Sequence, residues 1–292
     1  MKEERVCAGV VTYNPNLDLL EQNLNSLYPQ VAEVFVVDNG SNNKESLNTL
    51  LSNYNNLRVC WNSKNYGIAQ ALNLLCALAC KCGYSWIVTM DQDSVCDGSM
   101  IQYLAEYLSP RYGILAPCVV FKDEGVVIHA VKNHKDQETS KISACITSGS
   151  LTNLDAWKSV GGFDEWFFID HVDNEFCTHI IQKGYEIVRI NKAKLHQRAG
   201  EMRYIKLPHG KILLLPYYSP LRNYYICRNT IYYIRKYWRN INLYLEIRSF
   251  IYSQIIKLTF EKGRRNTLIS SLRGICDGLR KKIEYKDYCS AQ

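Results

Sequence analysis

Short apolar segments alternate with helical patterns through the first 115 residues of this 292-residue chain. Four segments have the length and composition of buried strands: Val6–Val11, Val34–Val37, Arg58–Trp61 and Trp86–Met90. Helices are expected between them, one with Leu17, Leu20, Leu24 and Leu27 on one face, and one over Ile68–Cys82 that Gly83 closes. Strands that alternate with helices form βαβ units, which build a mostly parallel sheet flanked by helices. The sequence therefore predicts an α/β fold of the Rossmann-like kind.

The pattern is looser in the middle of the chain. Strands are expected near Ile114–Val120, Val126–Val131 and Glu186–Ile190, and a helix over Val172–Lys183 that Gly184 caps. After His196 the composition shifts towards Tyr, Arg and Lys with helical periodicity. We therefore expect an α/β domain at residues 1–200 and a basic, aromatic-rich helical extension at residues 201–292.

The cysteines indicate a reducing environment. The chain has 12 of them and is 47% hydrophobic, enough apolar residues for a full core. They are scattered through apolar stretches, and no signal peptide precedes them, so we expect a cytoplasmic protein without a disulfide framework. The group Cys76, Cys80 and Cys82 lies on one apolar helical segment and lacks paired CxxC spacing, which favours core packing over metal binding.

Charge is distributed unevenly along the chain. Residues 1–188 hold 13 Lys and Arg against 22 Asp and Glu, a net charge of −9, whereas residues 189–292 hold 22 against 6, a net charge of +16. A basic carboxy-terminal third indicates an anionic partner: nucleic acid, a phosphorylated substrate or an acidic lipid surface. The most apolar stretch, Ile241–Phe260, is interrupted by Glu246, Arg248 and Lys257, so no membrane-spanning helix is expected.

Polar residues follow three of the expected strands. They are Thr12-Tyr13-Asn14, Asp38-Asn39-Gly40-Ser41 and Asp91-Gln92-Asp93-Ser94. In open parallel sheets the ligand binds beyond the carboxyl ends of the strands, so these residues are the first candidates for a site.

Asp91 and Asp93 place two carboxylates at the end of a buried strand, where like charges repel. A cation relieves this repulsion, and an oxygen-rich, partly open site suits Mg²⁺ or Mn²⁺. The alternative is a solvated turn, in which Asp and Ser are common.

Three further residues have a functional and a structural interpretation. Asp38 stands where α/β folds place an acid for a nucleotide base or ribose, or it simply opens a turn. Asp173 begins a helix, so it is a capping residue or a general base. His196 is structural or completes a metal site.

Taken together in this order and spacing, short motifs of the chain resemble glycosyltransferase family 2, over roughly residues 5–235. Besides the three strand ends, the matching segments are Asn65–Asn73, Thr147–Ser150, Gly161–Asp164, Ile169–Glu175 and Leu195–Gly200. The Asp91-Gln92-Asp93-Ser94 form is similar to the rhamnosyltransferase-like branch, which uses dTDP-rhamnose. The resemblance implies a GT-A fold and a nucleotide-sugar donor.

The same resemblance assigns roles to individual residues. It implies donor binding by Thr12, Tyr13, Asp38, Asn65, Gly67 and Asp91. It implies a Mg²⁺ or Mn²⁺ site at Asp93 and His196, and acceptor contacts from Ser148, Gly149 and Asp170. Asp173 would be the general base. The chain departs from many relatives at Val172, where they have Glu, and at His179, where they have Arg, so Asp170 competes with Asp173 for this role. Asp173 is preferred because it lies 23 residues before His196.

The resemblance implies an inverting transfer of rhamnose to a saccharide acceptor, lipid-linked in many relatives, in cell-surface polysaccharide (O-antigen or capsule) synthesis. Alternatives are transfer of galactofuranose or a hexose from a UDP-sugar, or a catalytically silent binding protein. The basic aromatic segment 219–238 packs on the main domain or contacts anionic lipid, and we expect the chain at the inner face of the cytoplasmic membrane. No nucleic-acid partner is expected, because the first domain is acidic and no nucleic-acid module is recognised.

Overall fold

The structure is a computed structural model that describes residues 6–123, 126–130, 137–198, 202–206, 212–216, 218–260 and 263–284. The chain divides into two compact units: unit 1 comprises residues 1–168, 172–198 and 286–292, and unit 2 comprises residues 169–171 and 199–285. Ala199 and Gly200, beside the predicted domain boundary, and Val131, at the end of a predicted strand, lie outside the described residues.

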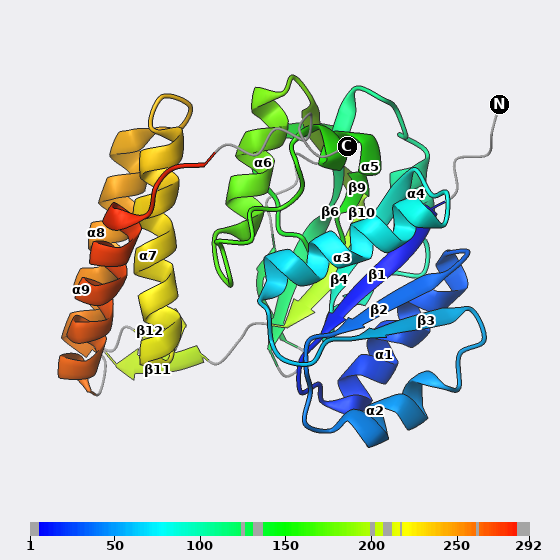
Figure 1. Ribbon diagram of the computed structural model, residues 1–292, viewed down its shortest axis with the longest axis horizontal. Helices are drawn as coiled ribbons and strands as arrows, with labels where there is room; N and C mark the ends of the chain where they lie inside the picture. The colour runs from blue at the N-terminus through cyan, green and yellow to red at the C-terminus, as the bar shows by residue number, and fades with distance from the viewer. Residues whose placement is uncertain are drawn as a thin grey trace. The chain divides into compact units, whose positions relative to one another are not determined.

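Unit 1 begins with the predicted parallel strands. They are β1 (Val6–Thr12), β2 (Val34–Asp38), β3 (Leu57–Trp61) and β4 (Trp86–Asp91), arranged in the order β3-β2-β1-β4. The helices between them are α1 (Leu17–Leu27), α2 (Lys44–Leu51) and α3 (Ile68–Lys81). The predicted α/β fold is confirmed, and Figure 1 shows its βαβ arrangement.

The second half of the sheet is mixed. Strand β9 (Leu151–Asn153) runs antiparallel between β4 and β6 (Tyr112–Asp123), and β10 (Glu186–Arg198) runs parallel to β6. Three short strands complete it: β5 (Val95–Cys96) and β8 (Thr139–Ile142) pair with β10, and β7 (Val126–Ala130) pairs with β6. The sheet thus continues well beyond the parallel strands that the sequence predicts.

Strand β10 is longer than predicted. It passes the expected end at Ile190 and continues to Arg198, with a register shift between Ile190 and Lys194. At this irregularity Asn191 is buried and its amide donates to the Gln137 carbonyl at 2.7 Å, so the polar residues are satisfied and the strand continues. His196 therefore lies inside a strand, opposite Val95, rather than after one as predicted.

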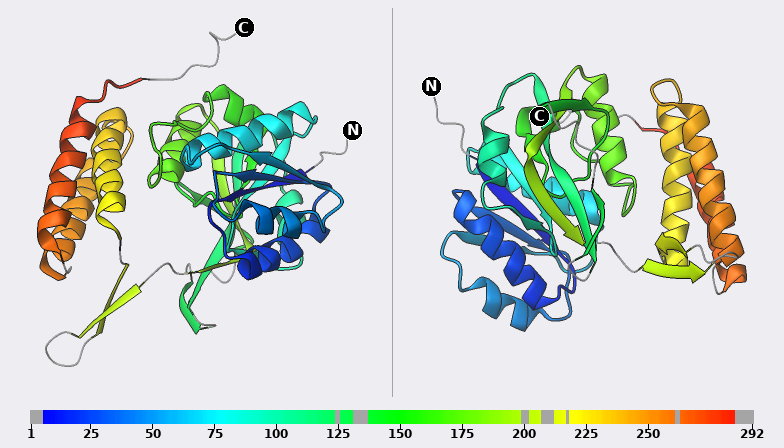
Figure 2. Two further views of the ribbon diagram at one scale, coloured as in Figure 1. Left: turned by 60° about the horizontal axis from the view of Figure 1, so that its bottom comes forward. Right: turned by 180° about the vertical axis from the view of Figure 1, so that it is seen from behind.

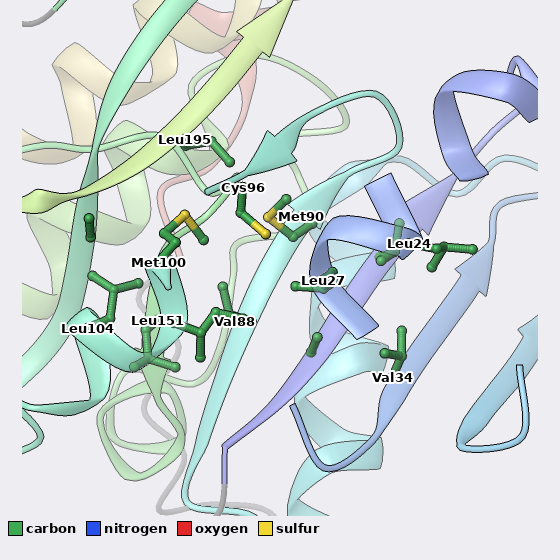
Figure 3. Close-up of a cluster of buried hydrophobic side chains, with 14 of the residues drawn as sticks. Leu24, Leu27, Val34, Val88, Met90, Cys96, Met100, Leu104, Leu151 and Leu195 are labelled. Carbon is green, nitrogen blue, oxygen red and sulfur yellow. The ribbon is translucent and has the colours of Figure 1, made fainter. Parts of the chain in front are cut away.

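Helices cover both faces of the sheet. Helices α1 and α2 lie on one face and α3 on the other, as the views of Figure 2 show. Figure 3 shows the core on the first face, where Leu24 and Leu27 of α1 and Met100 of α4 (Met100–Ala105) lie near Val88 and Met90. On the other face Leu75 of α3 lies over Gly9 and Ile87. This layered core fixes the strand ends that carry the candidate site.

Two helices follow β9 and precede β10. They are α5 (Leu154–Ser159) and α6 (Val172–Gln182), and α6 confirms the predicted helix to within one residue at its carboxyl end. A short 3₁₀ helix, Tyr28–Gln30, directly follows α1.

The described residues of unit 2 form a hairpin and three helices. The hairpin strands β11 (Met202–Lys206) and β12 (Ile212–Pro216) stand where helical periodicity was expected after His196, so that expectation is wrong there. The helices that follow are α7 (Pro220–Tyr237), α8 (Leu243–Phe260) and α9 (Arg264–Arg280). A Cβ atom on Gly274 of α9 would lie 2.4 Å from the Tyr224 carbonyl oxygen, so glycine permits close packing of α9 on α7. Among the helices in the described ranges, none is long and apolar enough to cross a membrane.

Candidate active site

The sheet brings three predicted strand ends together. Thr12 is the register partner of Asp38 across β1 and β2, and Val11 is the partner of Asp91 across β1 and β4. All three strands are parallel, so their carboxyl ends face one edge, where ligands bind in this class of sheet. The predicted donor-binding residues Thr12, Asp38 and Asp91 therefore share one edge of unit 1.

Asp38 is almost fully enclosed, at 1% exposure. Its Oδ1 accepts from the hydroxyls of Thr12, at 3.0 Å, and Ser41, and its Oδ2 accepts from the backbone N–H groups of Gly40 at 3.2 Å and Ser41 at 2.9 Å. Four donors match the acceptor capacity of a carboxylate. Asp38 opens the turn, as its structural interpretation expected, and a nucleotide that contacted it would replace one of the two hydroxyl donors.

Tyr13 lies at the tip of the same edge and is 45% exposed. Its backbone N–H donates to Oε1 of Gln92 at 2.8 Å, which ties the end of β1 to the loop after β4. The neighbouring Asn14 has a positive φ of 45° and accepts from the Asn42 N–H at 2.8 Å. The backbone around Tyr13 is fixed while its ring faces solvent, an arrangement that suits stacking on a flat ligand.

Asn39 organises the loop that carries Asn65 and Gly67. Its Nδ2 donates to Oδ1 of Asn65 at 3.0 Å and to the Gly67 carbonyl at 3.1 Å. Its Oδ1 accepts from Nδ2 of Asn62 at 3.0 Å and from the Tyr66 N–H at 3.1 Å. The amide is 3% exposed and uses all its hydrogen-bonding capacity, so it fixes residues 62–67 beside the end of β2.

Gly67 has a positive φ of 91°, and a Cβ atom there would lie 2.7 Å from the carbonyl oxygen of Phe168. The position needs glycine for both its backbone angle and its space. Helix α3 begins at the next residue, and the Ile68 N–H donates to the Phe168 carbonyl at 2.8 Å, so the start of the helix is held against Phe168.

A closed ring of hydrogen bonds holds Asp91. Its backbone N–H donates to Oγ of Ser148 at 3.1 Å, Ser148 donates to Oγ of Ser94 at 3.0 Å, and Ser94 donates to Oε1 of Gln197 at 2.6 Å. Gln197 completes the ring by donating from Nε2 to Oδ2 of Asp91 at 3.0 Å. Ser148, predicted to contact the sugar acceptor, is thus connected through Ser94 and Gln197 to Asp91, predicted to contact the nucleotide-sugar donor.

Burial raises the pKa of Asp91, the bond from Gln197 lowers it, and the charge of Asp93 raises it further. Burial also raises the pKa of Asp93, although the backbone N–H of Asp93 and the charge of Arg198 lower it. Two neighbouring carboxylates that are costly to ionise together are the setting that a divalent cation stabilises. The carboxylate oxygens of Asp91 and Asp93 are ligands of the kind that Mg²⁺ and Mn²⁺ prefer, so the pair fits the predicted metal.

His196 lies against Asp97. Its Nε2 lies 2.7 Å from Oδ1 of Asp97, and its Nδ1 is enclosed without a hydrogen-bond partner among the described residues. Within those residues, no group of three or more His, Cys, Asp or Glu side chains is arranged to hold a metal ion. A metal at Asp93 would therefore take much of its coordination from ligand oxygens and water, as Mg²⁺ commonly does. The role of His196 as a ligand stays a prediction.

The predicted acceptor segment lies beside the end of β4. The Gly149 N–H donates to the Thr89 carbonyl at 2.7 Å, and the Thr89 hydroxyl donates to the Thr147 carbonyl at 2.6 Å. Gly149 has a positive φ of 75° and lies against Leu195 and Pro117. The segment is therefore fixed to the sheet at both Thr147 and Gly149.

Asp173 lies in the first turn of α6, and its Oδ1 accepts from the Asn174 N–H at 2.9 Å. It lines a small pocket with Thr147, Cys145 and Cys177, among others. The pocket brings Asp173 to the neighbourhood of the acceptor segment, as a base for an acceptor hydroxyl requires.

Asp170 belongs to unit 2 and is held by Arg222. Nε of Arg222 lies 3.2 Å from Oδ2 of Asp170, and Nη2 lies 3.0 Å from Oδ1. Asn229 donates to the carbonyl oxygens of Ile169 at 2.7 Å and Asp170 at 2.9 Å. The structure therefore ties Asp170 to α7 within unit 2.

Several of these contacts were not predicted. Asn39, Ser94 and Gln197 belong to motifs that the sequence singles out, but they received no role there. Asn23 was missed altogether: it is fully buried on α1 and donates to the carbonyls of Asp91 at 2.9 Å and Ser94 at 2.7 Å. Its position between Leu20 and Leu24 on the apolar face of the helix is the signal that marks it, because buried polar groups need partners.

Residues 7–162, more than half of the chain, match the family described as Glycosyl transferase family 2. The chain belongs to this family. The predicted family and enzyme class are confirmed, and the protein is a glycosyltransferase. Over 290 residues it is 28% identical to the dTDP-rhamnosyl transferase RfbF of Shigella flexneri, and the match covers 94% of this chain and 95% of that protein.

Solved structures of other glycosyltransferases share the fold. Residues 1–349 of S. aureus TarS match with a TM-score of 0.61 and 15% identity over 94% of this chain and 81% of that one. A crystal structure of GalNAc-T7 with UDP, GalNAc and Mn²⁺ matches with a TM-score of 0.60 and 14% identity, over 82% of this chain and 49% of that one. The predicted α/β fold of the GT-A kind with carboxy-terminal helices is thus confirmed for this family 2 glycosyltransferase.

Proposed function

We propose that this glycosyltransferase transfers rhamnose from dTDP-rhamnose to a saccharide acceptor in the synthesis of a cell-surface polysaccharide. The observation that carries the proposal is the end-to-end similarity to a dTDP-rhamnosyl transferase, which spans 94% of this chain. The edge formed by Thr12, Asp38 and Asp91 supports it, because it offers the acids and hydroxyls that a nucleotide sugar needs. The alternative donor is a UDP-sugar, since TarS was solved with UDP-GlcNAc.

In this proposal the donor lies along the edge of the sheet. Tyr13 and Asp38 contact the base and ribose, and the loop around Asn65 and Gly67 lies near the diphosphate. Asp91 is oriented towards the donor by Gln197, which occupies one of its two oxygens. Asp93, with His196 as a candidate second ligand, would hold Mg²⁺ or Mn²⁺, which supplies Lewis-acid stabilisation of the departing diphosphate.

Asp173 is the proposed general base. It would remove the proton of the acceptor hydroxyl as that oxygen attacks the anomeric carbon in line, which inverts the configuration. The competing residue, Asp170, has both carboxylate oxygens engaged by Arg222, which supports Asp173. Ser148 and Gly149 would line the acceptor side.

The acceptor is proposed to be a lipid-linked saccharide at the inner face of the cytoplasmic membrane. Unit 2 supports this part of the proposal, since α8 exposes large apolar side chains. They include Tyr244, Ile251, Tyr252 and Ile255. Aromatic side chains beside basic ones suit the headgroup region of an anionic membrane. Sedimentation with anionic vesicles at low salt tests it, and a chain that remains in the supernatant contradicts it.

The transfer itself is tested with radiolabelled donor. Purified protein, dTDP-rhamnose labelled in the sugar, Mn²⁺ and a lipid extract from the source cells are incubated, and label in the lipid fraction is counted. We expect incorporation by the wild-type chain and little by Asp173→Asn. Incorporation from UDP-sugars alone would favour the alternative donor, and donor binding without transfer would indicate a silent binding protein.

A further inference from the structure

Two cysteines meet beside the proposed base. Sγ of Cys145 lies 3.7 Å from Sγ of Cys177, although the residues are 32 apart in the sequence. Cys145 precedes the Thr147–Ser150 segment, and Cys177 lies on α6. The two sulfurs line the same pocket as Asp173. We propose that Cys145 and Cys177 form a modification site, a thiol pair that a peroxide-class oxidant converts into a disulfide.

The two thiols differ in access. Cys145 is half-buried, whereas Cys177 is 1% exposed. The hydrogen bond with Cys145, together with burial, raises the pKa of the Cys177 thiol, so this group stays protonated. An oxidant therefore meets Cys145 first, and Cys177 is the resolving thiol, as in redox sites where an accessible cysteine stands next to a second one.

The chemistry balances in two steps. Hydrogen peroxide oxidises the Cys145 thiol to a sulfenic acid, and one oxygen leaves as water. The Cys177 sulfur then attacks the Cys145 sulfur, the S–S bond forms, and the sulfenic hydroxyl leaves with the Cys177 proton as a second water. Thiols are kept reduced in the cytoplasm, so a disulfide at this site would be transient and reversible.

Closing the bond requires a small, local movement. The sulfurs must approach from 3.7 Å to about 2.05 Å. Both sulfurs sit at the ends of short side chains that line the same small pocket, so rotation about the two Cα–Cβ bonds changes their separation. The crosslink joins the segment before Thr147 to α6, four residues after Asp173 and on the same side of that helix.

The consequence for transfer rests on the proposed function. The disulfide pulls the proposed base and the proposed acceptor segment into one fixed arrangement. Displacements of about 1 Å in an active site lower turnover by up to about 10²-fold. We expect kcat of the oxidised protein to fall by roughly 10- to 100-fold and to recover with dithiothreitol.

Tryptic cleavage sites lie on either side of each cysteine, so peptide mapping can detect the crosslink. Trypsin releases residues 142–158 and 159–183 as separate peptides, each with a single cysteine, Cys145 and Cys177 respectively. The full chain is treated with hydrogen peroxide, remaining thiols are alkylated, and the digest is analysed by mass spectrometry without reductant. Cys145→Ser and Cys177→Ser remove the pair, and Cys60→Ser, which changes another half-buried cysteine, is the matched control.

We expect the two peptides to appear crosslinked in the wild type and in Cys60→Ser, to separate after dithiothreitol, and to stay uncrosslinked in the other two variants. Full alkylation of both cysteines after peroxide, or oxidation of Cys145 to the sulfinic acid without a crosslink, would overturn the proposal. The crosslink is detected without any assay of sugar transfer. A chain that forms the crosslink after peroxide but transfers no rhamnose in its reduced state would therefore contradict the proposed function and leave the thiol site standing.

Discussion

Arg222 holds the carboxylate of Asp170 with two of its nitrogens, at 3.2 Å from Nε to Oδ2 and 3.0 Å from Nη2 to Oδ1. Such a pair fixes both oxygens of the acid and leaves it poorly placed to accept a proton from an acceptor. Asp170 and Asp173 are only three residues apart in the sequence. The ion pair with Arg222 indicates a structural role for Asp170 and leaves Asp173 as the candidate catalytic acid.

Replacing each acid by asparagine distinguishes them. Asp170→Asn keeps a residue that tolerates the positive φ of 63° at this position and should lower kcat by less than about tenfold. Asp173→Asn removes the proposed base and should lower kcat by about 10²–10⁴-fold. Steady-state rates of rhamnose transfer provide the comparison, and a larger loss in Asp170→Asn would transfer the role of base to Asp170.

Gly67→Ala should destabilise the protein more than Gly83→Ala. Both glycines have positive φ, 91° and 81°. A Cβ atom at Gly67 would lie 2.7 Å from the Phe168 carbonyl oxygen, whereas a Cβ atom at Gly83 would have no atom within 4 Å, apart from its chain neighbours, among the described residues. Gly83→Ala should cost only the backbone term of about 1–2 kcal/mol. Urea unfolding gives both values, and equal losses would show that the contact with Phe168 is unimportant.

Asn39→Asp should loosen the loop at residues 62–67. The carboxylate cannot donate to the Gly67 carbonyl or to Oδ1 of Asn65, so two hydrogen bonds are lost, at about 0.5–1.5 kcal/mol each. We expect a higher KM for the donor together with lower stability. Asn42→Asp introduces the same charge on an exposed side chain and should change neither, and similar effects of the two variants would argue against the proposed role of Asn39.

His171 should make unit 2 sensitive to acid. Thr230 donates to the Ile226 carbonyl at 2.7 Å and therefore accepts from Nε2 of His171 at 2.8 Å, which leaves an enclosed Nδ1 without a hydrogen-bond partner in the described ranges. Burial lowers the pKa of His171 to about 4, although the charge of Asp170 raises it. Protonation thus favours the unfolded chain, in which the pKa of histidine is about 6.5.

The stability that His171 contributes is fully present above pH of about 6.5 and is lost as the pH falls towards about 4, by as much as about 3 kcal/mol. The free energy of unfolding of the wild type, measured by urea at several pH values in this window, should fall more steeply than that of His171→Asn. Asparagine tolerates the positive φ of 62° and does not titrate. Parallel pH profiles would show that the pKa of His171 is the same in the folded and the unfolded chain, which would contradict the prediction.

The regular elements of unit 1 were predictable because their hydrophobic periods are long and uninterrupted. β1, β2, β4, α1 and α3 match the expected segments to within about two residues, the usual uncertainty of element ends. Strand β9 has only three residues, too few to show a period. The continuation of β10 depends on Asn191 finding the Gln137 carbonyl, a contact that no local pattern encodes.

The edge of the site was predictable because the ends of parallel strands must meet, and Thr12, Asp38 and Asp91 do so. The contacts that orient those residues were not. Gln197 reaches Asp91 across 106 positions of sequence, and only the folded sheet brings them together. His196, its neighbour, was predicted to be a metal ligand together with Asp93, and its Nε2 lies 2.7 Å from Oδ1 of Asp97, a contact that the sequence does not indicate.

This family 2 glycosyltransferase is proposed to bind dTDP-rhamnose with a divalent metal at the edge of the sheet. Isothermal titration calorimetry of dTDP-rhamnose and UDP-GlcNAc, each with Mn²⁺ or with EDTA, is carried out on the wild type and on Asp93→Asn. Asp155→Asn is the control, because this exposed acid lies at the start of α5, next to Asn153, which pairs with Trp86 at the opposite end of β4. We predict that dTDP-rhamnose binds at least about tenfold more tightly than UDP-GlcNAc, a difference of about 1.4 kcal/mol, and that EDTA or Asp93→Asn abolishes this binding. Tighter binding of UDP-GlcNAc, or unchanged binding of dTDP-rhamnose in EDTA, would contradict the claim.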